Sequence, residues 1–262
     1  MDALVDAVVE TLDALRRTGP LVHCQTNNVV TGFTANVLLA AGCSPAMVDD
    51  VEDAAVFATL ADGLLVNLGT LAHERSDAMR AAVAARGDLP WVLDPVAAGP
   101  LPARTALARE LLARRPTVLR GNASEILGVA GDASAGRGVD AGDGPEAALG
   151  TARDLADTYG CVVAVSGPVD VITDGVTVVR VTAGHPLMTQ VTGVGCALGA
   201  LVAATLAVAP PVVAATAATA LLCAAGSRAA IGEVGPGTFA VRLLDQLAAL
   251  TSAEVVDDVV LT

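Results

Sequence analysis

The sequence predicts an α/β protein with a mostly parallel central sheet and helices on both faces. Short apolar runs alternate with longer stretches of helical periodicity along most of the 262 residues. Such alternation is typical of a parallel sheet that is covered on both sides. Hydrophobic residues make up 53% of the chain and aromatic residues only 2%, so alanine, valine and leucine must build a large core.

The predicted elements follow in a regular order. Residues 2–16 carry apolar side chains at helical spacing, and Thr18-Gly19-Pro20 ends this helix. Five apolar runs then predict strands, at residues 21–23, 64–67, 91–94, 117–120 and 161–166. Helices are expected between them, near residues 29–41, 53–61, 74–86, 102–114, 122–129 and 145–158.

The second half of the chain has a different pattern. Residues 169–173 and 176–182 flank Asp174-Gly175, which predicts a hairpin. Beyond Gly195 the pattern is mostly helical, over residues 196–207, 212–231 and 236–250. The glycine-rich residues 128–144 are expected to form a surface loop within a single domain over residues 1–262, because strands and helices alternate on both sides of it.

Composition excludes several functional classes. The net charge of −13 argues against a nucleic-acid partner. No apolar run reaches the roughly 18 residues of a membrane span without polar interruption, and acidic residues near Met1 argue against a signal peptide, so we expect a cytoplasmic protein without a membrane partner. Five scattered cysteines predict reduced thiols and no zinc site. All fifteen basic residues are arginine, which excludes a Schiff-base lysine and a Walker-A P-loop.

Polar residues end the five predicted strands. In an open parallel sheet, ligands bind beyond the carboxyl ends of the strands. We therefore expect these side chains to converge on one crevice. They are His23, Asn67, Asp94, Arg120 and Ser166.

A glycine turn at residues 191–196 leads into an apolar helix and is the most informative stretch of the chain. Free N–H groups and the positive end of the helix dipole make such a turn an anion site, formed here by Gly193, Val194 and Gly195. Cys196 lies at the junction, where a thiolate would be favoured, so it is a candidate base or nucleophile. The alternative is a core cysteine.

Other candidates also have a structural alternative. Asp94 precedes a proline and is either a turn residue or a carboxylate near a magnesium-bound phosphate. Glu125 completes a capping box or lies near the metal, and Arg120 forms a surface ion pair or holds a phosphate. Asn27 caps a helix or faces the crevice, and Met47 fills the core or walls a ligand.

Taken together, eight motifs in one order resemble the hydroxyethylthiazole kinase family from about residue 20 to about residue 250. The resemblance implies a ribokinase-like α/β fold. The implied reaction transfers the γ-phosphate of ATP, with Mg²⁺, to the primary hydroxyl of 4-methyl-5-(2-hydroxyethyl)thiazole in thiamine salvage. It also implies homotrimers with active sites between subunits. The motifs are Pro20-Leu21-Val22-His23 with Thr26-Asn27, Thr34-Ala35-Asn36, Ser44-Pro45-Ala46-Met47, Leu93-Asp94-Pro95-Val96, Arg120-Gly121-Asn122-Ala123-Ser124-Glu125, Asp170 with Thr173-Asp174-Gly175, His185-Pro186-Leu187-Met188-Thr189 and Gly193-Val194-Gly195-Cys196.

The resemblance also assigns roles by position. Cys196 matches the position where related kinases have a catalytic aspartate, and Gly193 and Gly195 match the anion hole. Met47 and Gly193 are the expected substrate contacts. Val194 replaces the usual threonine of the anion hole, and Ser166-Gly167-Pro168 replaces the usual Thr-Gly-Glu. The remaining assignments are Arg120, Ser166 and Asn27 for ATP, and Asp94 and Glu125 for magnesium.

Two other functions remain open. A kinase of another small alcohol, such as a hydroxymethylpyrimidine or pyridoxal, is disfavoured by Cys196 in place of aspartate. A catalytically silent ligand-binding homologue is disfavoured because Asp94, Arg120, Glu125 and Cys196 are all present.

Overall fold

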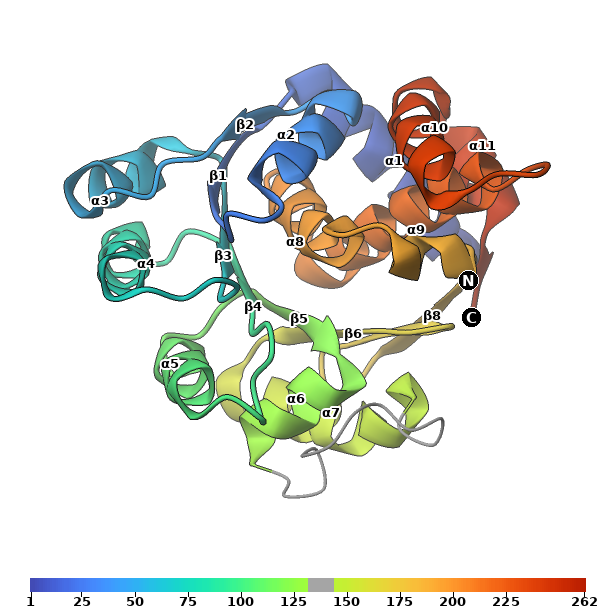
Figure 1. Ribbon diagram of the computed structural model, residues 1–262. Coiled ribbons are helices and arrows are strands. Elements are labelled where there is room, and N and C mark those ends of the chain that lie inside the picture. The colour runs from blue at the N-terminus through green and yellow to red at the C-terminus, as the bar shows by residue number, and fades with distance from the viewer. Residues whose placement is uncertain (132–143) are drawn as a thin grey trace.

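The computed structural model describes residues 1–131 and 144–262. Nine strands among these residues form one sheet in the order β2-β1-β3-β4-β5-β6-β7-β8-β9 (Figure 1). Strands β1 to β6 run parallel, and β7, β8 and β9 add antiparallel pairs at one edge. The strands are β1 (Leu21–Gln25), β2 (Ser44–Ala46), β3 (Gly63–Asn67), β4 (Trp91–Asp94), β5 (Val118–Asn122), β6 (Val162–Ser166), β7 (Asp170–Thr173), β8 (Val178–Thr182) and β9 (Val260–Leu261).

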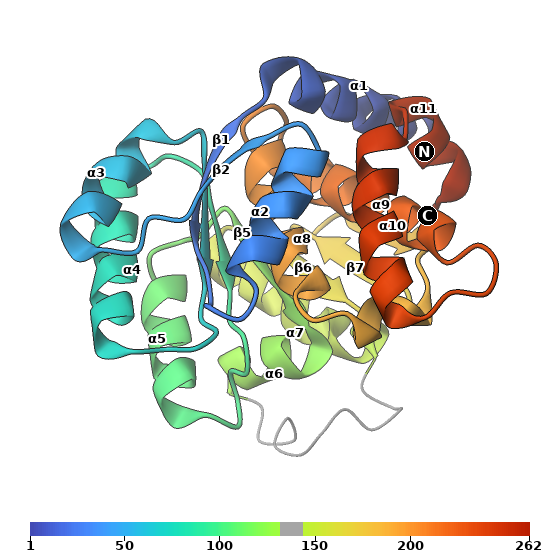
Figure 2. The same cartoon turned by 45° about the horizontal axis from the view of Figure 1, so that its top comes forward.

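Helices cover both faces of the sheet, so the molecule has three layers (Figures 1 and 2). One layer comprises α1 (Asp2–Thr18), α2 (Thr31–Ala40), α8 (Val194–Thr205), α9 (Pro211–Ala229), α10 (Pro236–Ala249) and α11 (Ser252–Asp258). The other comprises α3 (Val51–Leu60), α4 (His73–Arg86), α5 (Pro102–Leu112), α6 (Ala123–Ala130) and α7 (Pro145–Tyr159). A short 3-10 helix, η2 (Pro186–Gln190), precedes α8.

Alternation along the strands separates the interior into two cores. Leu65 and Val92 face the α8 layer, whereas Leu64 and Leu93 face the α4 layer. All four side chains are buried, as expected for parallel strands that are covered on both faces. Helix α8 packs directly on β3 and β4, which places its N-terminus near the carboxyl ends of the central strands.

Helix α9 is the one described helix that is long and apolar enough to cross a membrane by length and composition. In the fold, 78% of its apolar window is buried. It contacts α1, α8, α10 and α11 as well as the sheet, so it is a central core helix of this layer.

The predicted strands and helices are confirmed to within a few residues at their ends, whereas β2, β9, α11 and η2 were not predicted, and β5, like β1, extends two residues further than predicted. Strand β2 was missed because it has three residues, one of them proline, which only an edge strand tolerates. Strand β9 has two residues. Helix α11 was missed although Thr251 starts it with a capping box. Strand β1 continues past His23 to Gln25. Residues 128–130 of the predicted loop belong to α6, and residues 132–143 lie outside the described part of the chain.

Candidate functional site

Helix α8 begins at the glycine turn, as predicted. Gly193 precedes the helix with a φ of +100°, and a Cβ there would lie 2.9 Å from Val30 Cγ1, so the turn requires glycine. No side chain of the described residues caps the helix, so the N–H groups of its first turn are available to a ligand. Cys196 is the third residue of the helix. The start of α8 therefore has the glycine turn and the uncapped N–H groups on which the anion-hole prediction rests.

Four of the five predicted strand-end residues meet beside this turn: Asn67, which hydrogen-bonds to Asp94, together with Asp94, Arg120 and Ser166. Arg120 donates from Nη2 to Ser166 Oγ at 2.8 Å and from Nη1 to Asp94 Oδ2 at 3.5 Å. The guanidinium faces the start of α8, because a Cβ on Gly195 would lie 3.4 Å from Arg120 Nη1. Neighbouring strands β3, β4, β5 and β6 supply the four side chains, which confirms that these strand ends converge.

Asp94 is the most deeply buried ionisable residue of the site. Its side chain is 1% exposed, and burial raises the pKa of its carboxyl to about 7, while Arg120 opposes this shift and Glu125 adds to it. Its Oδ1 atom is buried and has no hydrogen-bond partner in the described part of the chain, and the same holds for Nε of Arg120. The site therefore keeps one acceptor and one donor unpaired, which suits a bound cation beside a bound anion.

Glu125 has the structural role that its spacing indicates. Its N–H donates to Asn122 Oδ1 at 2.9 Å, and its Oε2 accepts from the N–H of Asn122 at 2.9 Å, which completes a capping box. Oε1 accepts from the N–H of Ala97 at 3.0 Å. Glu125 nevertheless lines the same small cavity as Asp94. In residues 1–131 and 144–262, no three His, Cys, Asp or Glu side chains cluster as a metal site, so these two carboxylates are what the cavity offers.

Cys196 is half-buried beside this charge cluster. Burial raises the pKa of the Cys196 thiol, Asp94 raises it further, and Asn67, Arg120 and Asn27 lower it. The prediction that the thiolate is favoured is therefore wrong. The helix N-terminus was the only influence visible in the local sequence, whereas a buried carboxylate from β4 lies close by in the fold.

Asn67 lies in the crevice as its strand-end position predicts, but the sequence indicated no specific contact for it. It is fully buried, and its Nδ2 donates to Asp94 Oδ2 at 2.9 Å. Its Oδ1 accepts from Asn27 Nδ2 at 3.1 Å, and the same Asn27 nitrogen lies 3.4 Å from Cys196 Sγ. The thiol is thus joined to the carboxylate through two amides. The available signal was the position of Asn67 at a strand end.

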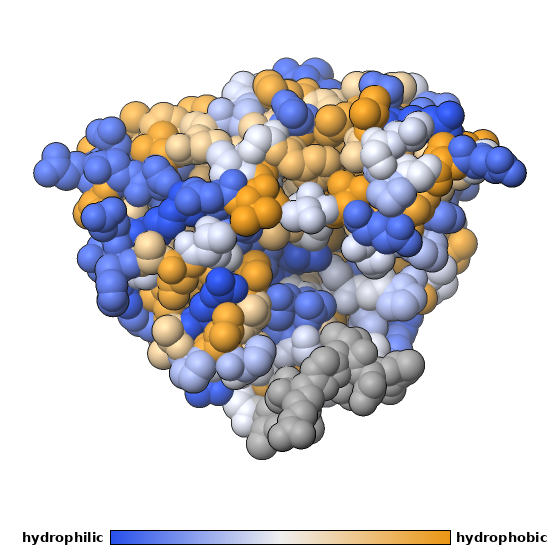
Figure 3. All heavy atoms as spheres, in the orientation of Figure 1, coloured by the Kyte–Doolittle hydropathy of each residue, from blue (hydrophilic) through white to orange (hydrophobic). Residues whose placement is uncertain are grey.

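Two cavities meet at the start of α8. The smaller, about 210 Å³, is lined by Asp94, Arg120, Glu125, Cys196 and neighbouring residues. The larger, about 710 Å³, runs from Arg120 and Ser166 past η2 to Cys223, and its walls are mostly apolar. Both are lined by Gly193 and Gly195. Figure 3 shows the corresponding view of the molecule hollowed near its centre, with hydrophilic residues in the hollow.

Two other predicted site residues, His23 and Met47, lie away from the start of α8. His23 does not join the crevice: it points into the α3 layer, where its ring packs on Phe57 and its Nε2 donates to the carbonyl of Val48 at 2.7 Å. Burial lowers the pKa of His23. Met47 packs at the edge of the α8-side core and lines neither cavity at the start of α8.

Asn27 does not cap a helix, and Val194 packs in the core. Val30 precedes α2 without a side-chain cap, so Asn27 is not its N-cap. Val194 is buried in the core and lines the larger cavity. Its backbone N–H still belongs to the first turn of α8.

Comparison with known proteins identifies the family of this chain. The model of the hydroxyethylthiazole kinase family matches residues 12–253. This chain belongs to the hydroxyethylthiazole kinase family. Among curated family members, the hydroxyethylthiazole kinase of Clavibacter sepedonicus is 57% identical over 240 residues (90% of this chain, 87% of that one). The hydroxyethylthiazole kinase of Cutibacterium acnes is 50% identical over 259 residues (97% and 93%).

Solved structures of two kinases have the same fold as this chain. A hydroxyethylthiazole kinase structure from Pyrococcus horikoshii OT3 has a TM-score of 0.90 and 35% identity, covering 97% of this chain and 98% of that one. A pyridoxal kinase from Staphylococcus aureus, in complex with AMP-PCP and pyridoxal, shares the fold with a TM-score of 0.59 and 16% identity, covering 79% and 87%. The predicted ribokinase-like α/β fold and family membership are thus confirmed. The individual roles of the hydroxyethylthiazole kinase residues stay predictions.

Proposed function

We propose that this protein transfers the γ-phosphate of ATP to the primary hydroxyl of 4-methyl-5-(2-hydroxyethyl)thiazole. The observation that carries the proposal is the continuous polar contact from Cys196 through Asn27, Asn67 and Asp94 to Arg120 at the start of α8. Family membership supplies the thiazole alcohol as substrate and ATP as phosphate donor. Phosphoryl transfer depends chiefly on alignment and charge stabilisation, and this contact chain provides both.

The larger cavity suits the nucleotide. Its mouth carries Arg120, Ser166 and the first N–H groups of α8, all of which bind phosphate oxygens well. Its interior is mostly apolar, which suits the nucleotide base, while the phosphates would lie at the polar mouth. In this arrangement the γ-phosphate would lie between Gly193 and Arg120, at the junction with the smaller cavity.

The residues of the smaller cavity fit a magnesium ion. Asp94 Oδ1 is a buried acceptor without a partner, and Glu125 adds a second carboxylate to the cavity wall. When bound, the ion would neutralise the charge of the transferred phosphoryl group. Asp94 would then hold the ion, Asn67 would fix the orientation of Asp94, and Glu125 would act mainly through its charge because backbone N–H groups occupy its oxygens.

Cys196 is proposed to receive the substrate hydroxyl. It is the group of the first α8 turn that lines the smaller cavity with a titratable side chain. Because its pKa is raised, most molecules hold a protonated thiol at neutral pH, and the rate should climb as the thiolate forms at alkaline pH. The thiolate would take the hydroxyl proton as the alcohol oxygen attacks the γ-phosphorus, and the bond from that phosphorus to the β-phosphate oxygen would break to release ADP.

We propose that the assembly is a homotrimer with the substrate between subunits. Met47, the expected substrate wall, lies away from both cavities, so a second copy would have to bring it to the thiazole. Exposed Leu39, Val56 and Leu60 on α2 and α3 lie near the β2 edge of the sheet and would be covered in such an assembly. All five cysteines are free, which supports a cytoplasmic protein. We treat residues 1–262 as one catalytic domain.

Turnover with purified alcohols tests the proposal. ADP release would be followed with ATP, Mg²⁺ and either the thiazole alcohol, a hydroxymethylpyrimidine or pyridoxal. We expect turnover with the thiazole alcohol at a kcat/KM at least about 10²-fold above the other two, since rejecting a poorly fitting ring costs a few kcal/mol. Turnover with the pyrimidine alcohol alone would overturn the proposal, and binding without turnover of any alcohol would show a silent homologue.

A further inference from the structure

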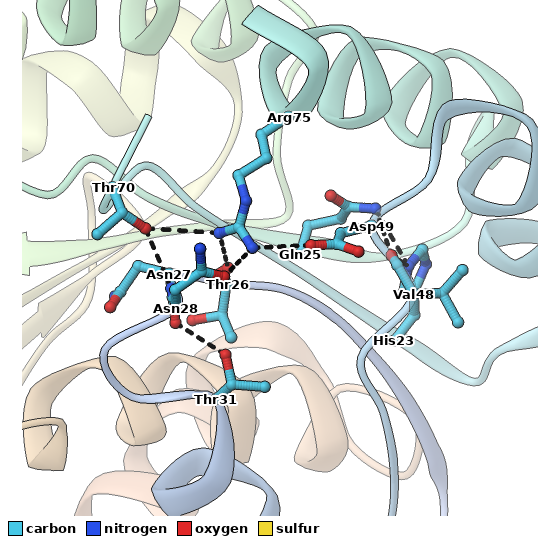
Figure 4. A network of polar contacts seen from close by, with 10 residues as sticks. All are labelled: His23, Gln25, Thr26, Asn27, Asn28, Thr31, Val48, Asp49, Thr70 and Arg75. Atoms are coloured by element: carbon cyan, nitrogen blue, oxygen red, sulfur yellow. Dashed lines mark hydrogen bonds and ion pairs between the residues drawn. The ribbon is translucent and has the colours of Figure 1, made fainter. Parts of the chain in front are cut away.

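Arg75 lies outside both cavities, yet it joins three loops at the edge of the site (Figure 4). Its side chain is only 14% exposed. It donates to the carbonyl of Thr26 at 2.9 Å, to Asp49 Oδ2 at 2.7 Å, to Asn28 Oδ1, and weakly to Thr70 Oγ1 at 3.5 Å. One side chain of α4 therefore holds the loops that follow β1, β2 and β3.

Two of these contacts are to the residues on either side of Asn27. Thr26 and Asn28 are held from the α4 side, whereas the Asn27 side chain makes its contacts with Asn67 and Cys196. Asn27 is 5% exposed, and a Cβ on the neighbouring Gly69 would lie 2.6 Å from its side chain. The space around the Asn27 amide is thus tight, and its placement depends on where the loop runs.

Besides Arg75, hydrogen bonds from α2 and from the loop after β3 hold this loop. It lies between the end of β1 and the start of α2 and is neither strand nor helix. From the α2 side, the Asn27 carbonyl accepts from Val30 N at 3.3 Å and from Thr31 Oγ1 at 3.0 Å. From the α4 side, Asn28 N donates to Thr70 Oγ1, which Arg75 also contacts.

We propose that Arg75 is a positioning residue that holds the Asn27 amide against the Cys196 thiol. The significance for phosphoryl transfer rests on the proposed function, but the contact itself does not. An arginine suits the task because its planar fork donates in several fixed directions at once. A lysine would keep the charge but would place it at one point, so it could not hold a carbonyl, an amide and a carboxylate together.

The proposal predicts a change in the chemistry of Cys196. A hydrogen bond from Asn27 favours the thiolate over the thiol, so a displaced amide should raise the pH at which the thiolate forms. Loss of one such bond corresponds to a shift of about 0.5–1 pH unit, or about 3- to 10-fold less thiolate at a given pH. Cys196 is half-buried while the other four cysteines are buried, so iodoacetamide should report mainly on Cys196.

The experiment measures the pH midpoint of iodoacetamide alkylation, with mass spectrometry to locate the label. We expect Arg75→Met and Arg75→Lys both to raise the midpoint by about 0.5–1 unit. Arg80→Met is the matched control, because Arg80 lies on the same helix and, among residues 1–131 and 144–262, forms ion pairs only with exposed Asp77 and Glu110. It should leave the midpoint unchanged. Thermal melts of each variant would verify that it is folded, and Arg75→Lys carries the test if Arg75→Met is not.

A double-mutant cycle separates positioning from a field effect. If Arg75 acts through the amide, Asn27→Ala should shift the midpoint as Arg75→Met does, and the double variant should shift it no further. Additive shifts, an unchanged midpoint in Arg75→Met, or a wild-type midpoint in Arg75→Lys would overturn the proposal. Alkylation needs neither ATP nor alcohol, so failure of the proposed function would appear separately, as wild-type protein without turnover. With turnover established, kcat of Arg75→Met should fall about 10- to 100-fold with KM for ATP unchanged.

Discussion

Gly195→Ala is expected to stabilise the protein and to remove its activity. Gly195 lies in the first turn of α8, and an added Cβ would lie 3.4 and 3.5 Å from the two terminal nitrogens of Arg120. These are ordinary contact distances, so the fold tolerates the methyl group. The methyl would, however, occupy the gap between the N–H groups of the helix and the guanidinium, which is where we place the transferred phosphoryl group.

The two effects have opposite signs and measurable sizes. Replacing glycine by alanine in a helix stabilises a protein by about 0.5–1 kcal/mol, which corresponds to a rise in Tm of roughly 1–4 °C for a chain of this size. Excluding the phosphoryl oxygens from one helix donor should lower kcat by about 10²–10³. Gly150→Ala is the matched control, since Gly150 is an exposed residue of α7 with nothing within 4 Å of its Cβ position. It should gain similar stability at wild-type activity.

Thermal melts and steady-state ADP release on the three proteins provide the readouts. Wild-type activity in Gly195→Ala would refute the placement of the phosphoryl group at the start of α8. A large loss of stability would show instead that Arg120 cannot accommodate the methyl group, and the activity loss would then say nothing about the anion site. The control guards against a general effect of alanine in a helix.

Three further predictions follow from the electrostatics of the site. Cys196→Ser should lower kcat by about 10²–10⁴. Cys196→Asp should retain activity, with its pH optimum moved to lower pH. An unchanged rate in Cys196→Ala would show that the thiol moves no proton. In the folded protein the carboxyl of Asp94 holds its proton up to about pH 7, whereas in the unfolded chain it loses the proton near pH 4. The unfolding free energy of the wild type, measured by urea denaturation, should therefore fall between pH 4 and pH 7. Relative to Asp94→Asn, the fall should be on the order of 3 kcal/mol. A constant difference between the two proteins would contradict the burial of this charge. Val194→Thr should change kcat by less than about 5-fold, because one hydroxyl is worth about 1 kcal/mol and the backbone donor is already present; a larger gain in steady-state rate would show that the hydroxyl itself binds phosphate.

Most of the fold could be predicted because the local patterns and the tertiary structure agree. Strands β3, β4 and β6 are short apolar runs that are buried on both faces, and their periodicity alone distinguishes them from the helices between them. Strand β2 could not be predicted in this way. Ser44-Pro45-Ala46 has no strand pattern of its own and pairs with β1 only because α2 returns the chain to that edge.

The site was predictable to the extent that it follows from sheet topology. Parallel strands bring Asp94, Arg120 and Ser166 to one edge whatever the loops do. The contact between Asn27 and Cys196 spans 169 positions and depends on three loops, so no local signal contains it. The raised pKa of Cys196 escaped prediction for the same reason, because burial of the thiol and the approach of Asp94 to it arise only in the folded chain.

The most direct test of the account is a crystal structure with the thiazole alcohol and a non-hydrolysable ATP analogue. We predict that the γ-phosphate lies within hydrogen-bond distance of the N–H groups of residues 193–196 and of Arg120, with the alcohol oxygen facing Cys196 and a magnesium ion on Asp94. A γ-phosphate bound elsewhere in the larger cavity, with the start of α8 facing neither phosphate nor alcohol, would contradict it.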